Sequence, residues 1–190
     1  MCFVGRSAFR ALSCLNSGTI SPCQSKIACS NRLMVEPMSP IPVQDRRHFF
    51  ILPQGFEGGG YYTYGTPDRG RSQYAHPRML TVLHWVAVKW SELDTRKFGI
   101  GNISLADGVD HPHHGSHESG LEVDIRPVRK DGKHLPCTMR DPQYDRDGTA
   151  KLIALFNQHP MVALILFNDR SIQRVRSAVG HDNHFHVELG

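Results

Sequence analysis

Seven of the twelve histidines lie in two short stretches of the chain, four within residues 111–117 and three within residues 181–186. Asp124 follows the first stretch, seven residues beyond His117. Imidazole and carboxylate groups are the usual protein ligands of a catalytic zinc ion, which takes three of them and keeps one position for water. His117, Asp124 and one member of the His-x-His pair in the second stretch supply such a set and leave a spare imidazole. The spacing therefore predicts a zinc hydrolase site.

The segments around Asp124 and around His184 and His186 have the alternating pattern of half-buried strands. If both strands belong to one sheet and share a core, all three side chains emerge on the face opposite that core. Gly120 permits turn conformations that would bring His117 back to this face. The alternative is a histidine-rich surface patch that titrates near neutral pH. Such a patch does not require two strands in phase, so the pattern favours the metal site.

Two motifs summarise these residues: His114-x-x-His117-x-x-Gly120-Leu-x-Val-Asp124-Ile and His181-x-x-His184-x-His186-Val. Together they resemble the penicillin-insensitive murein endopeptidase family, which belongs to the group of zinc peptidases that includes lysostaphin-type and D-Ala-D-Ala peptidases. The resemblance covers roughly residues 45–190. It implies an α+β fold, in which a small antiparallel sheet carries the zinc site on one face and helices pack on the other. It also implies cleavage of peptide cross-links in bacterial peptidoglycan by a metalloprotease.

On this interpretation, His117, Asp124 and His186 bind one zinc ion. His184 lies one strand repeat from His186, so its imidazole could take a proton from water and pass it to the leaving amine. His114 and His181 would orient the water or stabilise the oxyanion, or they could be ligands in an alternative metal state.

A second metal ion is also left open by the resemblance. Asp131 and His134 match a segment that can hold an additional metal in the family, and His114 is a further candidate ligand. A tight turn at Asp131-Gly132 explains the same residues equally well.

The sequence between the motifs predicts the supporting elements. Strands are expected over residues 48–52 and 98–105, a helix over 149–158 with Asp147 as a possible cap, and a buried strand over 161–167. A short helix is expected to contain Ile172, Val175 and Val179 and to end at Gly180.

Another helix is expected to begin at Pro77, with His84 as a core or boundary residue. Its apolar seam would consist of Met79, Leu83, Val86, Trp90 and Leu93. Three tyrosines, Tyr61, Tyr62 and Tyr64, could line a substrate groove or pack at a sheet edge.

Residues 1–40 differ from the zinc peptidase domain expected over residues 45–190. They hold four of the five cysteines, and Arg6, Arg10, Lys26 and Arg32 account for the whole net charge of +4. From Glu36 onward 18 basic residues meet 18 acidic ones, so the charge does not indicate a nucleic-acid partner. We expect residues 1–40 to be a disordered segment or a mis-assigned start. An organellar transit peptide is a weaker alternative.

No stretch reaches the ~20 apolar residues of a membrane span, and no signal peptide is recognisable. We therefore expect an enzyme that acts in the periplasm or on the cell wall after phage lysis or delivery by a secretion apparatus. An injected effector would have a cognate inhibitory protein as a further partner besides peptidoglycan. Two other functions remain open: a D,D-carboxypeptidase or other stem-peptide amidase of the same group, and a zinc-stabilised, non-catalytic binding module.

Overall fold

The computed structural model of the chain describes residues 43–54, 59–64, 71–112 and 115–190. The predictions for residues 1–40 and for His114 lie outside these residues. The described part contains both helices and sheets, so the α+β fold class is confirmed.

A five-stranded sheet forms the centre of this part, in the order β2-β4-β5-β7-β6. Its strands are β2 (Tyr61–Thr63), β4 (Phe98–Ile100), β5 (Glu122–Ile125), β6 (Val162–Leu166) and β7 (Phe185–Leu189). Strands β4, β5, β7 and β6 pair antiparallel, whereas the edge strand β2 runs parallel to β4. The sheet is therefore mixed, and its antiparallel part carries the histidine motifs. A separate two-stranded sheet joins β1 (Phe50–Ile51) to β3 (Tyr74–Ala75).

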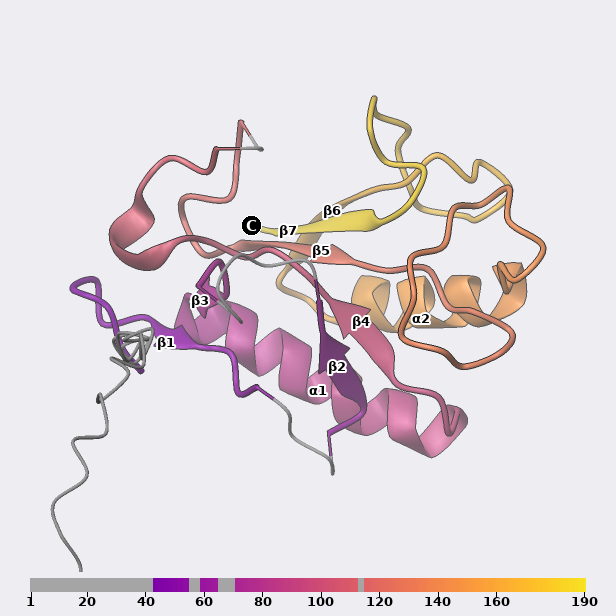
Figure 1. Ribbon diagram of the computed structural model, residues 1–190, viewed down its shortest axis with the longest axis horizontal. Helices are drawn as coiled ribbons and strands as arrows, with labels where there is room; N and C mark the ends of the chain where they lie inside the picture. The colour runs from indigo at the N-terminus through magenta and orange to yellow at the C-terminus, as the bar shows by residue number, and fades with distance from the viewer. Residues whose placement is uncertain (1–42, 55–58, 65–70, 113–114) are drawn as a thin grey trace, which may run out of the picture. The chain divides into compact units, whose positions relative to one another are not determined.

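Two helices, α1 (Pro77–Leu93) and α2 (Arg146–Gln158), lie on the same side of the strands (Figure 1). Their buried residues join the apolar sides of the strands in one core. Phe156 of α2 shows the contact, because its ring meets Phe98 of β4 and Phe185 of β7 edge to face. The alternating pattern then leaves Asp124 and His186 on the sheet face away from this core.

Helix α1 begins at Pro77 as the sequence predicts, whereas α2 begins at Arg146, three residues before the predicted start at residue 149. Pro77 is the first residue of α1, but Leu93 is 61% exposed and His84 is exposed rather than in the core. The helix turns its last residue to solvent because its buried stripe ends at Trp90. The cap of α2 is Asp145, whose carboxylate accepts a hydrogen bond from the Gly148 amide, and not Asp147.

The prediction for residues 161–167 is correct in type and wrong in burial. Strand β6 is an edge strand in which only Ile165 is buried. The short helix expected over 172–179 is wrong. Residues 171–174 instead form turns and a bend, and Arg176 pairs with β6 through hydrogen bonds to the backbone of Ile165 and Phe167. Val179, expected on an apolar helix face, is fully exposed.

Candidate metal centre

Asp124 and His186 lie directly opposite each other on the neighbouring strands β5 and β7. Both residues are buried, although they occupy the sheet face away from the helices. Directly opposed residues in an antiparallel pair project their side chains to the same side, about 4.5–5.5 Å apart. The strand register alone therefore brings the carboxylate and one imidazole together.

His117 joins them through a turn in the backbone. His117 and Gly120 both have left-handed backbone angles, with φ of 73° and 71°. A Cβ atom at Gly120 would lie 2.8 Å from the backbone nitrogen of His76, so only glycine fits there without displacement. The backbone N–H of His117 donates to the Glu122 carboxylate, and its Nδ1 lies 3.0 Å from the Ile103 carbonyl oxygen. The carbonyl favours the tautomer with hydrogen on Nδ1, which leaves the Nε2 lone pair for a metal.

The three side chains converge on one oxygen atom. Asp124 Oδ1 lies 3.2 Å from His117 Nε2 and 3.2 Å from His186 Nδ1. Ligands about 2.0–2.1 Å from a tetrahedral zinc ion are separated by roughly 3.3 Å, so these distances fit such an ion. All three donor atoms lie within 4.8 Å of one another. The buried His117–Asp124–His186 group could therefore hold a metal ion.

The ionisation of this group also suits a cation. Burial alone would raise the pKa of the Asp124 carboxyl, but hydrogen bonds from His117 and His186 lower it well below its ordinary value. Burial alone would lower the pKa of His117, but the hydrogen bond and charge of Asp124 raise it. An anionic carboxylate thus faces an imidazole that binds a proton readily. A divalent cation would replace that proton and satisfy the same carboxylate.

His184 lies beside the group but is more open to solvent. Its Nε2 is 3.5 Å from Asp124 Oδ1, and its side chain is 20% exposed. Its Nδ1 lies 2.8 Å from the side-chain oxygen of Asn183. The His181 ring is 4.9 Å from the His184 ring, and both line a cleft of about 370 Å³ together with the three potential ligands. The cleft gives a substrate access to the histidines.

Asp131 and His134 are not brought into this group. The Asp131 carboxylate pairs with Arg129 at 2.6 Å and accepts a hydrogen bond from the Lys133 amide, as in a turn. The His134 ring stacks on Tyr62, with centroids 3.8 Å apart. A second metal ion at these residues stays a prediction, and so does any part played by His114.

Several supporting groups were not predicted from the sequence. The Ile103 carbonyl and the Glu122 carboxylate hold His117, and the Asn102 carbonyl accepts a hydrogen bond from the Asp124 amide. The carbonyl partners have no sequence signal, because every residue has a main-chain oxygen. Glu122 could have been suspected, because it shares a strand face with Asp124.

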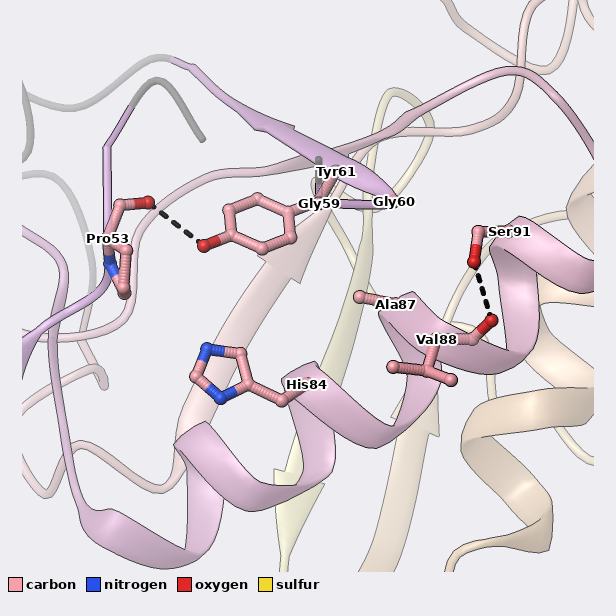
Figure 2. A pocket seen from close by; sticks show the side chains of 8 residues that line it. All are labelled: Pro53, Gly59, Gly60, Tyr61, His84, Ala87, Val88 and Ser91. Carbon is pink, nitrogen blue, oxygen red and sulfur yellow. Dashed lines mark hydrogen bonds between the residues drawn. The ribbon is translucent and has the colours of Figure 1, made fainter. Parts of the chain in front are cut away.

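A second pocket, of about 320 Å³, lies between α1 and the beginning of β2. Figure 2 shows the Tyr61 hydroxyl bonded to the Pro53 carbonyl across this pocket, with the His84 ring below. Apolar groups such as Ala87 and Val88 form much of the remaining wall. The described residues that line this pocket include no pair of groups that could activate a nucleophile. The described histidines and the aspartate of the two motifs line the other cleft, at the candidate metal centre.

Neither helix in the described part of the chain is long and apolar enough to cross a membrane. The fold brings the described histidines of the two motifs and Asp124 to one cleft. No known family model matches the chain, and no curated protein matches it.

Proposed function

We propose that the chain is a zinc metallopeptidase that hydrolyses peptide cross-links of bacterial peptidoglycan, of the D-Ala–diaminopimelate endopeptidase type. The observation that carries the proposal is the buried His117–Asp124–His186 group with His184 beside it at an open cleft. Two imidazoles and one carboxylate are a ligand set of catalytic zinc sites. The substrate comes from the resemblance of the motifs to murein endopeptidases.

The neighbours of His184 support its assignment as the general base. When Nδ1 donates its hydrogen to the Asn183 oxygen, Nε2 carries the lone pair on the side of Asp124. From there Nε2 can take a proton from the attacking water and deliver it to the leaving amine. A bound zinc ion would supply Lewis-acid activation of the water and of the scissile carbonyl.

The other residues hold the reacting groups in place. The Ile103 carbonyl fixes the orientation of the His117 ring, and Asp124 lies between both imidazole ligands. His181, whose ring lies beside that of His184, would orient the water or stabilise the oxyanion.

The general base separates this proposal from a zinc-stabilised binding module, which needs His186 but has no use for His184. The test is to incubate the zinc-loaded protein with purified cross-linked muropeptides and to identify the products by mass spectrometry. Cleavage of cross-links indicates an endopeptidase, and release of a terminal D-Ala indicates a carboxypeptidase.

His184→Ala should keep the bound zinc and lower turnover by about 10²–10⁴, the usual contribution of a positioned base. His84→Ala, an exposed histidine on α1, is the matched control and should leave turnover unchanged. Unchanged hydrolysis by His184→Ala at saturating zinc would show that the proton goes to another group, with His181 the next candidate.

A further inference from the structure

Gly99 and Gly101 lie in and directly after β4, the strand beside β5, and the Gly101 amide donates to the Asp124 carbonyl. A Cβ atom at Gly99 would lie 2.7 Å from the Tyr62 ring, and one at Gly101 would lie 2.9 Å from the Tyr64 ring. Since β4 separates β2 from β5, both aromatic rings can lie across β4 only because these positions lack a side chain. The glycines therefore direct the two tyrosines toward the strand that carries Asp124.

Arg126 directly follows β5, and its guanidinium packs on the Tyr64 ring. Its amide donates to the Gly99 carbonyl, which continues the ladder of β5, so Arg126 and Asp124 share a sheet face. The guanidinium lies 3.8 Å from the centre of the Tyr64 ring, and its Nη1 donates to the His134 carbonyl at 3.3 Å. The Cα atom of Arg126 lies about 6.6 Å along the strand from that of Asp124, and the contacts with Tyr64 and His134 hold its partly exposed side chain.

The charge of Arg126 is not balanced by an acidic partner. No carboxylate of the described residues lies within ion-pair distance of it, whereas Arg47, Arg96 and Arg129 each pair with an aspartate. A guanidinium has five N–H donors in a planar fork that matches a carboxylate. Its hydrogen bond to the His134 carbonyl and its interaction with the Tyr62 hydroxyl leave further N–H donors for a ligand.

We propose that Arg126 binds a carboxylate of the substrate, one strand repeat from the scissile bond. This inference rests on the proposed peptidase function and specifies its substrate class: a peptide with a free carboxylate one or two residues from the bond that is cleaved. The rings of Tyr64 and Tyr62 form an aromatic surface beside the guanidinium, and the His134 ring stacks on Tyr62. The carboxylate could be that of a diaminopimelate side chain or a chain terminus, since both have the same chemistry.

The test uses a cross-linked stem-peptide dimer in three forms: with free carboxylates, with the diaminopimelate carboxylate amidated, and with the terminal carboxylates amidated. Binding of each form to the zinc-loaded His184→Ala protein is measured by calorimetry, with and without Arg126→Met. We expect Arg126→Met to weaken binding of the free form by about 10- to 100-fold, as for a lost charged hydrogen-bond pair. One amidated peptide should bind equally to the proteins with and without Arg126→Met. The carboxylate that is amidated in this peptide is the one that Arg126 binds.

Arg46→Met, which removes an exposed arginine paired with Asp107, is the charge-matched control and should not change binding. Arg126→Lys keeps the charge and loses the fork, so it should weaken binding of the free form selectively, by less than Arg126→Met. Equal weakening of all three forms, or no weakening of any, would overturn the proposal. Hydrolysis by the wild-type chain is measured separately, so a protein that binds selectively but cleaves nothing would refute only the peptidase function.

Discussion

Asp124 is the residue on which the centre depends, because one of its oxygens faces three imidazoles. The carboxylate lies 3.2 Å from both His117 and His186 and 3.5 Å from His184. An isolated buried carboxylate is costly, so its stability in the fold requires a proton or a cation among these groups.

The first prediction concerns the metal ligands. Replacing His117, Asp124 or His186 with alanine should remove most of the bound zinc, because each variant leaves only two of the three ligands. The metal content of purified protein, measured by plasma mass spectrometry, checks this. His134→Ala should still bind one zinc ion. Full zinc stoichiometry in all three ligand variants would show that the ion lies elsewhere.

At the scale of elements, the turn before β5 determines whether His117 reaches the other ligands. Gly120→Ala should destabilise the protein by at least about 1–2 kcal/mol, the cost of a left-handed alanine, and more because of the contact with His76. Zinc affinity should fall with it, because the same turn places His117. Urea unfolding and a competitive zinc titration measure the two effects.

Gly115→Ala is the matched control in the same loop. No atom lies within 4 Å of a Cβ built there, so its unfolding free energy and zinc affinity should stay close to those of the wild type. Equal zinc affinities for Gly120→Ala and the wild type would mean that the turn does not position His117.

The two helices are joined by an ion-pair network at Arg96. Its guanidinium pairs with Asp94, at the end of α1, and with Asp145, the cap of α2. Arg96→Met should lower the free energy of unfolding by about 2 kcal/mol, less than for a fully buried pair because the groups are about one-fifth exposed. Lys89→Met, which removes an exposed pair with Glu92, should cost well under 1 kcal/mol.

The contribution of Arg96 should depend on pH. Hydrogen bonds from the Arg96 guanidinium are the main cause that lowers the pKa of Asp94. Burial alone would raise the pKa of Asp145, but hydrogen bonds from the Gly148 amide and from Arg96 lower it. Because the folded pKa values lie below the unfolded value of about 3.9, this stability is complete above pH ~4 and is lost as the pH falls further. The difference between wild type and Arg96→Met should therefore shrink between pH 6 and pH 3. A constant difference would contradict the ion-pair explanation.

At the scale of the whole molecule, the sequence predicts the pattern within one strand better than it predicts which residues pair between strands. Alternation along β5 and β7 correctly predicted that Asp124 and His186 share a face, because the pattern repeats within each strand. It could not show that the two residues are paired directly, since register depends on the whole sheet. The helix expected over 172–179 is wrong for a related reason: three spaced apolar residues also suit a segment of turns that pairs with β6 only at Arg176.

The proposed substrate lies outside the cytoplasmic membrane, and this gives a prediction for the whole molecule in bacteria. Expression in the cytoplasm should be tolerated, whereas fusion to a periplasmic export signal should cause lysis, because only the exported protein meets peptidoglycan. Culture turbidity and release of soluble muropeptides measure the effect. Lysis caused by the unfused chain would show that residues 1–40 direct export.

The catalytic residues decide whether such lysis is enzymatic. Exported His184→Ala should not lyse the cells, because it keeps the fold and the metal ligands but lacks the base. Exported His84→Ala should lyse them like the wild type, since its exposed histidine lies on α1, which packs on the other face of the sheet. If the exported wild-type protein is folded, zinc-loaded and harmless, a cell-wall substrate is wrong. Lysis by His184→Ala at the wild-type rate would instead point to damage by export itself.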